Sequence, residues 1–233
     1  VHSHVRALAF GQPEQFERFL GYYVAAFHVA LAKYSLGHSI RLYEETDRTV
    51  WLYPTDESRG DATYIFRHED IGFIPHARRL PMLREQFAKS GWIAEDVLHD
   101  VESTEPIFFD SLTLIVMPDW HRGRVALLGD ACGCLTLAAG QGSHMAMAGA
   151  YVLARELDRG ADHQTAFEAY QNFLKPHVAR KQRDAARFAS LIVPSVRSHP
   201  ILRRLALRLI FSAPAIKYAM RFFGTRSVLP ADA

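Results

Sequence analysis

The sequence has little cysteine, little net charge and no long apolar run, and each shortage excludes a class of protein. Its two cysteines, Cys132 and Cys134, are too close together for an ordinary disulfide and too few for a structural zinc site. They fit the reducing environment of the cytoplasm. The net charge of +2 predicts no nucleic-acid partner. No apolar run approaches the roughly 20 residues that span a bilayer, and no charged and then apolar leader opens the chain.

Two motifs of binding sites are also absent. The fingerprint GxGxxG, whose backbone cradles a dinucleotide pyrophosphate in a first βαβ unit, occurs nowhere in the sequence. The histidines show no i, i+4 pair with a carboxylate, so no metal site is predicted. With 233 residues, 49% of them hydrophobic, the chain can still bury one sizeable core or two modest ones.

The charges are distributed unevenly along the chain. Between Lys175 and Arg226 almost every charged residue is Lys or Arg, and Asp184 is the lone acid. One interpretation is a set of helices whose arginines lie along an apolar surface and help to meet an anionic cofactor. The alternative is association with an anionic membrane, for which the amphipathic pattern of residues 201–210 is suited.

The most informative stretch is 123–131, followed about ten residues later by Gly140-Gln141-Gly142. Residues 125–128 are a short apolar run ended by Gly129, which predicts a buried strand. Asp130 then follows the carboxyl end of that strand, where open α/β sheets bind their ligands. Glycines allow close approach of the backbone, and amides at a helix start suit an anionic or electron-rich ligand. The pattern indicates a site for a cofactor with sugar-like hydroxyls and a polarised ring.

This pattern resembles the second FAD motif of the flavoprotein monooxygenases of the para-hydroxybenzoate hydroxylase type, GRVxLxGDAAHxxxPxxGQGxNxAxxDA. Residues 148–157 are similar to the subgroup that includes the tetracycline-inactivating monooxygenases. The matches begin at Gly123 (GRV), Gly129 (GDA) and Gly140 (GQG). The departures are Cys132-Gly133 for Ala-His, Leu137 for proline, His144 for asparagine and Gly149 near the usual acidic residue.

The first residues of the chain resemble the end of the same family's middle motif, GADGxxSxVR. Ser3 and Arg6 fall at the matching positions. The resemblance implies that the chain begins inside the FAD domain and that the N-terminal half of this domain, with its GxGxxG unit, is missing. A complete small protein without that unit is the alternative. Arg6 is interpreted as either a structural salt-bridge partner or a ligand contact.

The resemblance implies an FAD-dependent oxidoreductase, most simply a monooxygenase. NAD(P)H would reduce FAD, O2 would add to form a C4a-hydroperoxyflavin, and an aromatic or polycyclic small molecule would be hydroxylated. The flavin carries this chemistry, so no catalytic side chain is predicted. The alternatives are a flavin-dependent halogenase or reductase on the same scaffold, or a small-molecule-binding fragment without activity. The WxWxIP signature of halogenases is absent.

The resemblance also implies a set of cofactor-binding residues. Asp130 would accept a hydrogen bond from a ribityl hydroxyl, unless it is only a solvated turn or N-cap residue. Backbone amides at the helix start would face the flavin pyrimidine edge, where reduction builds negative charge. The full predicted set is Gly129, Asp130, Leu137, Gly140, Gln141, Gly142, Ser143 and His144.

The predicted fold class is α/β (α+β), with a partial FAD-binding Rossmann-like domain, an antiparallel-sheet substrate domain and a C-terminal helical tail. Predicted domain segments are 1–20 (end of an FAD-domain segment), 21–117 (substrate domain), 118–160 (FAD domain) and 161–233 (C-terminal helices). The predicted strands are 22–35, 39–45, 49–53, 62–66 and 110–117. The predicted helices are 75–89, 92–101, 143–157 and 164–173, with Pro176 opening or kinking the next.

The substrate is expected to bind between the antiparallel sheet and the flavin. An aromatic-rich sheet face with Phe27, Tyr34, Tyr64 and Phe66 could receive a flat apolar ligand. Ordinary core packing explains the same residues equally well, so no substrate-binding residue is predicted.

Overall fold

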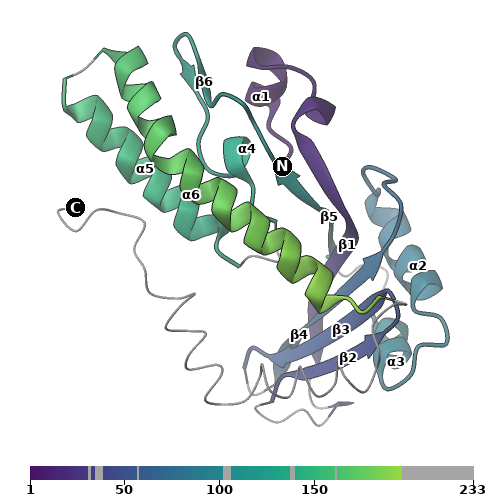
Figure 1. Cartoon of the computed structure of the whole chain (residues 1–233). Coiled ribbons are helices and arrows are strands. Elements are labelled where there is room, and N and C mark those ends of the chain that lie inside the picture. The colour runs from purple at the N-terminus through teal and green to yellow at the C-terminus, as the bar shows by residue number, and fades with distance from the viewer. Residues whose placement is uncertain are drawn as a thin grey trace.

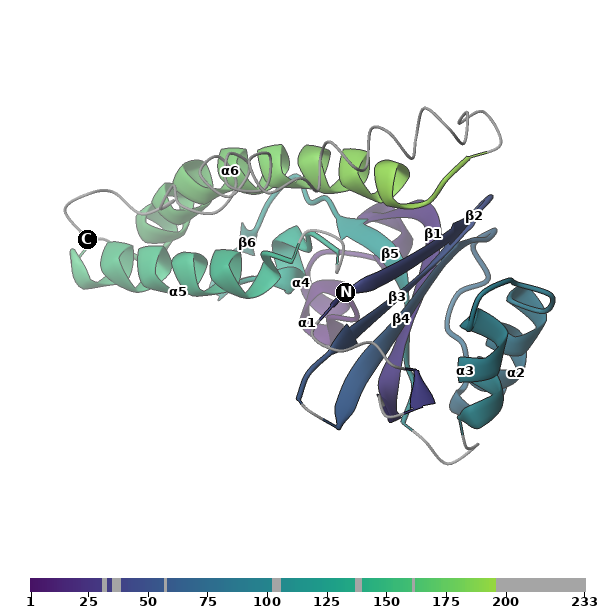
Figure 2. The ribbon, with the colours of Figure 1, turned by 90° about the horizontal axis from the view of Figure 1, so that it is seen from below.

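The computed structural model describes residues 1–30, 33–34, 39–56, 58–101, 106–136, 140–160 and 162–195. An antiparallel sheet with two helices on one face adjoins a helical unit that contains the glycine-rich motif (Figure 1). Figure 2 shows α2 and α3 on one side of the sheet and α5 and α6 on the other. The mixed α/β class with an antiparallel sheet is therefore confirmed. Within these ranges no helix has both the length and the apolar character that crossing a membrane requires.

The sheet has the strand order β2-β3-β4-β1-β5, and every neighbouring pair in it is antiparallel. β1 lies between β4 and β5, so large side chains such as Tyr23 and Val24 are buried on its two faces. This two-sided burial explains why the alanine-rich stretch after residue 23, which also fits a helix, is a strand up to Ala30. The strands are β1 (Glu17–Ala30), β2 (Arg41–Glu45), β3 (Arg48–Pro54), β4 (Arg59–Arg67) and β5 (Phe108–Ile115).

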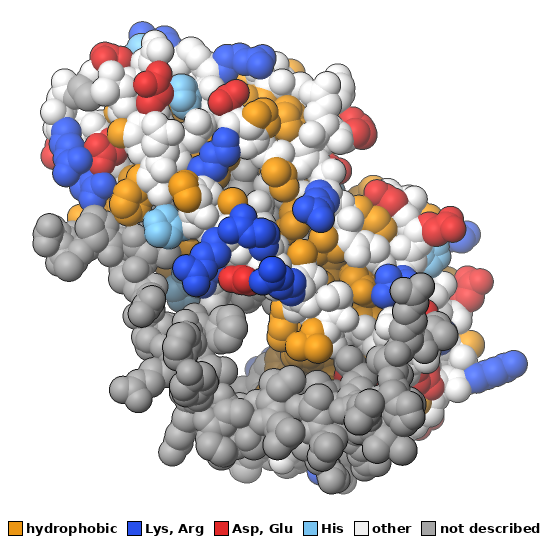
Figure 3. Space-filling model, viewed as in Figure 1, with side chains coloured by type: hydrophobic (Ala, Val, Ile, Leu, Met, Phe, Trp, Pro, Cys, Tyr) orange, Lys and Arg blue, Asp and Glu red, His pale blue; other side chains and the backbone are white. Residues whose placement is uncertain are grey.

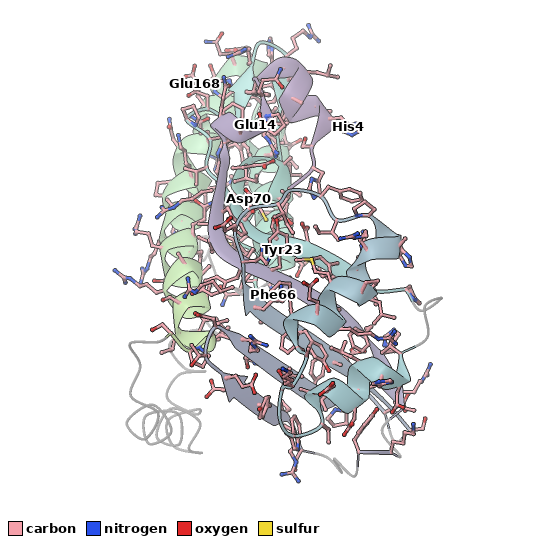
Figure 4. All side chains as sticks on the ribbon, turned by 90° about the vertical axis from the view of Figure 1, so that its right-hand side faces the viewer. His4, Glu14, Tyr23, Phe66, Asp70 and Glu168 are labelled. Carbon is pink, nitrogen blue, oxygen red and sulfur yellow. The ribbon has the colours of Figure 1, made fainter. Side chains whose placement is uncertain are left out.

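One face of the sheet packs against α2 (His76–Gln86) and α3 (Ala94–Asp100). Tyr23 and Phe66 lie in this core, and the Tyr23 hydroxyl donates to Asp70 Oδ1 at 3.3 Å (Figure 4). Phe27 and Tyr64 belong to the same core, with Tyr34 packed at its margin. The aromatic face that could have received a flat ligand is thus covered by α2 and α3, and the core-packing interpretation is correct.

The second unit joins the N-terminal residues to the glycine-rich motif. Phe16 shares a hydrophobic core with Trp120, Leu127 and side chains of two long antiparallel-packed helices. The predicted helix 143–157 is confirmed as α5. The elements are α1 (His4–Ala9), η1 (Pro13–Gln15), β6 (His121–Arg122), β7 (Val125–Ala126), α4 (Asp130–Gly133), α5 (Gly142–Asp158) and α6 (His163–Ile192).

The predicted buried strand 125–128 is only partly correct. Just Val125 and Ala126 form a strand, β7, and it pairs with β6 in a two-stranded hairpin. Val125 is 36% exposed, whereas Leu127 is 3% exposed. Among the described residues β7 has no other strand partner, so its outward side chain meets no second layer. Leu127 and, in part, Leu128 pack into the core instead.

The prediction that Pro176 opens a new helix is wrong, because α6 runs through it as one helix of 30 residues; a kink at Pro176 stays a prediction. Proline removes one backbone hydrogen bond and disfavours a helix interior by about 3 kcal/mol. Tyr170, Leu174 and Val178, on both sides of Pro176, are buried in the core, and this burial offsets that cost. The end of α6 then packs on the second face of the sheet through Ile192. The predicted tail helices, including 201–210, lie outside the described residues.

Candidate functional site

A cleft of about 440 Å³ lies where the sheet meets the glycine-rich motif. Asp110, Ser111 and Thr113 of the edge strand β5 line one side. Asp130, Gly142 and Ser143, from the starts of α4 and α5, line the other. Residues about 20 to 30 positions apart in the sequence thus form opposite walls of one polar cleft.

The structure places the Asp130 carboxylate beside the first residue of α5. A Cβ built on Gly142 would lie 3.6 Å from Asp130 Oδ1. Gly129, immediately before Asp130, has φ +60° and ψ −135°, a backbone conformation that favours glycine. That turn allows α4 to begin at Asp130 with its exposed carboxylate at the cleft. The carboxylate and the helix start that the sequence pattern combined are therefore neighbours in space.

Of the other predicted cofactor-binding residues, some line the cleft and some do not. Ser143 lines the cleft with Gly140, whose φ is +60°. Gln141 occupies the N-cap position of α5, and His144 is exposed on its first turn without lining the cleft. Leu137 lies outside the described residues. Their binding role stays a prediction, because no ligand contact tests it.

Two departures from the family pattern have a packing explanation. A Cβ on Gly133, where the family usually has histidine, would lie 2.7 Å from Val178 Cγ1 of α6. A Cβ on Gly149, near the usual acidic residue, would lie 2.9 Å from Leu128 Cδ1. In this chain α6 and the residues after β7 therefore occupy the space that side chains at these positions would need.

The Arg6 side chain contacts the start of α4. Its side chain is 1% exposed, and Nη1 donates to the Ala131 carbonyl at 3.1 Å. Nη2 lies 3.4 Å from Glu17 Oε1 in an ion pair. These contacts fit the structural interpretation of Arg6, because the guanidinium bonds protein groups on the N-terminal segment and on the residue after Asp130.

The segment after α4 is fixed from two sides. Gln182, buried on α6, donates through Nε2 to the Cys134 carbonyl at 3.0 Å and to the Ile115 carbonyl at 2.7 Å. The Ile115 amide also donates to the Cys134 carbonyl, at 3.4 Å. Burial raises the pKa of the neighbouring Cys132 thiol to about 12, and burial raises that of Cys134 as well. Both free thiols are therefore protonated near neutral pH and are poor nucleophiles.

The exposed face of α6 carries the described part of the basic stretch. Figure 3 shows Lys and Arg side chains gathered over the middle of this helix around an acidic one. No Lys or Arg among the described residues lines the cleft. These basic side chains therefore do not face the ligand position, and the interpretation that they meet an anionic cofactor gains no support here.

Sequence reasoning missed the polar residues Ser111, Thr113 and Thr136 of the cleft wall. The Ser111 and Thr113 hydroxyls lie 2.7 Å apart on β5. They alternate with Leu112 and Leu114, which are buried on the other face, so the period of two could have marked them. Thr136 precedes Leu137 in the motif and carried no signal of its own.

No protein-family model matches the chain. A flavin-dependent monooxygenase from an unknown prokaryotic organism is 33% identical over 186 residues, which are 78% of this chain and 48% of that protein. A flavin-dependent monooxygenase of Legionella longbeachae is 28% identical over 188 residues, again 78% of this chain and 48% of that protein. The chain thus spans about half the length of the curated relatives it matches.

The solved structures that resemble this chain include a tetracycline destructase and a complex with FAD. The tetracycline destructase Tet(55) matches with a TM-score of 0.77 and 25% identity, over 98% of this chain and 60% of that one. A variant of Klebsiella pneumoniae HpxO complexed with FAD matches with a TM-score of 0.73 over 95% of this chain and 58% of that one. At 19% identity the second match supports the fold alone. By sequence and by fold, the chain is similar to about half of a flavin-dependent monooxygenase.

Proposed function

We propose that this chain supplies the second half of an FAD site in an NAD(P)H-dependent monooxygenase that acts on an aromatic or polycyclic small molecule. The observation that carries the proposal is the placement of the Asp130 carboxylate beside the start of α5, in a cleft that also borders the sheet. A polypeptide upstream would supply the GxGxxG unit. We also propose a cytoplasmic location, which the two buried free thiols fit.

The residues of the cleft fit a flavin chemically. A ribityl chain offers hydroxyl donors, and Asp130 offers an exposed carboxylate acceptor. The first amides of a helix have no partner within the helix, so Gly142 and Ser143 present donors to an electron-rich ring edge. The two kinds of group lie on the same wall of the cleft, as one ligand with hydroxyls and a polar ring requires.

When bound, FAD would accept electrons from NAD(P)H and activate O2. The contribution of this chain is to bind and orient. Asp130 would fix the ribityl chain, and the positive end of α5 would favour the negative charge that reduction places on the ring. The β5 wall faces this position with Ser111 and Thr113, which suits a substrate that carries polar substituents.

The relatives support the substrate class without identifying the substrate. Tet(55) is named a tetracycline destructase, and HpxO has been solved with FAD and uric acid. Both named compounds are ring systems with polar substituents. For this chain we propose the same class, a planar ring system that enters between β5 and the flavin.

The proposal predicts a selective effect of Asp130→Asn on flavin binding. Loss of one charged hydrogen bond should weaken FAD affinity by about ten- to a hundredfold, since such bonds contribute roughly 1.5–3 kcal/mol. Flavin fluorescence titration measures the change, and Asp158→Asn at the far end of α5 is the matched control. Equal FAD affinity in wild type and Asp130→Asn would contradict the assignment.

A further inference from the structure

Thr136 combines three features that no other described residue of the cleft shares. Its φ is +66°, in the left-handed region that β-branched residues rarely adopt. It is 8% exposed, and Oγ1 has no hydrogen-bond partner. The residue nevertheless lines the cleft opposite β5, together with Asp130.

Both the backbone and the hydroxyl of Thr136 destabilise the free protein. A buried hydroxyl without a partner loses its bonds to water and gains none in return. A strained backbone persists only where the surrounding structure imposes it, and such positions concentrate at ligand sites. Here Gln182 and Ile115 bond the Cys134 carbonyl, and the Thr136 amide faces the Cys134 sulfur. The segment is therefore held in a conformation that leaves one polar atom unsatisfied.

A buried threonine elsewhere in the chain shows the usual arrangement. Thr49 of β3 is 0% exposed, but its hydroxyl donates to the Tyr43 carbonyl at 2.9 Å and accepts from Trp51 Nε1 at 3.2 Å. Thr49 stabilises the sheet through these bonds. Among the described residues the Thr136 hydroxyl has no such partner, so it is available to a hydrogen-bonding group that enters the cleft.

We infer that the Thr136 hydroxyl is a direct hydrogen-bond partner of the ligand in the Asp130 cleft. Resting on the proposed function, that ligand is a flavin, and the bonded atom is a heteroatom of its ring or a hydroxyl of its ribityl chain. Thr136 thereby joins Asp130 and the start of α5 as a third binding group. It is the only one of the three that is already buried before the ligand arrives.

The inference predicts opposite effects on stability and binding. Thr136→Val keeps the shape and removes the unsatisfied hydroxyl, so the melting temperature of the ligand-free protein should rise or stay unchanged. Affinity for FAD and riboflavin should fall about five- to tenfold, the loss expected for one neutral hydrogen bond. Thr136→Ser, which keeps the hydroxyl, should bind flavin like wild type. Thr49→Val, the matched control, should lower the melting temperature and leave flavin affinity unchanged.

Fluorescence titration and thermal unfolding of the four proteins, in the preparation that retains flavin, test the inference. Lumiflavin, which has the ring without the ribityl chain, separates the two sources: a loss with lumiflavin assigns the bond to the ring, and a loss with riboflavin alone assigns it to the ribityl chain. Unchanged flavin affinity in Thr136→Val, or a loss that accompanies a lower melting temperature, would overturn the inference. If Asp130→Asn still weakens binding, the proposed function stands; a wild type that binds no flavin overturns both.

Discussion

The two walls of the cleft differ in how completely their residues are satisfied. On the sheet side, the Ser111 and Thr113 hydroxyls of β5 hydrogen-bond to each other at 2.7 Å. Away from the cleft, the buried Thr49 and Tyr64 hydroxyls of the sheet also have partners. On the motif side, Gly129 and Gly140 have positive φ, and Thr136 is strained and unpaired. The other non-glycine residues with positive φ, such as Asp47, lie in turns at the surface. The unfavourable backbone angle and the unpaired hydroxyl therefore occur inside the protein, at the place where we propose that the ligand binds. Such exceptions to local preference are expected at functional sites.

The largest expected effect separates stability from binding. Phe66→Ala removes a fully buried ring from the core between the sheet and α2 and should lower the free energy of unfolding by about 3–5 kcal/mol. Urea unfolding measures it, with Phe73→Ala, 75% exposed, as the control. Flavin affinity of the folded fraction should not change. A large change in affinity would mean that the sheet core and the cleft are not independent.

A middle-sized effect concerns the contact between the start of α4 and β1. Arg6→Met removes the buried guanidinium that holds the Ala131 carbonyl and pairs with Glu17, and should cost about 1–3 kcal/mol of unfolding free energy. Because Ala131 adjoins Asp130, flavin affinity should fall as well. Thermal unfolding and fluorescence titration of one preparation measure both. A loss of stability with intact affinity would show that Arg6 does not position Asp130.

The smallest effect belongs to the sheet side and depends on pH. Burial alone would raise the pKa of Glu45, but hydrogen bonds from Tyr43, Ser90 and the Gly91 amide, with the Arg48 charge, outweigh it and lower the pKa. A depressed pKa stabilises the folded state above the unfolded pKa, and the contribution disappears as pH falls through the folded value. Glu45→Gln should therefore cost up to about 1 kcal/mol at pH 7. The difference from wild type should shrink as pH falls below about 4.3, the ordinary pKa of a glutamate; a difference that does not shrink with falling pH would contradict this cause.

The sheet side was also the easier side to predict. Alternating and aromatic residues at 49–53 and 62–66 specify strands locally, and the structure contains them as parts of β3 and β4. On the motif side, β7 is short because it has one partner, and α6 continues through Pro176 because distant side chains bury both of its halves. These outcomes depend on contacts between residues far apart in the sequence. The pairing of Asp130 with the start of α5 was predictable only because a motif records it.

The absorbance spectrum between 350 and 500 nm, recorded after mixing with FAD and desalting, tests the central claim most directly. It should be measured for this chain alone and with the upstream polypeptide that the family pattern implies. We predict retained flavin in at least one preparation, and its loss when Asp130 is replaced by alanine. Flavin absent from both preparations would contradict the account and would favour a small-molecule-binding fragment without a cofactor.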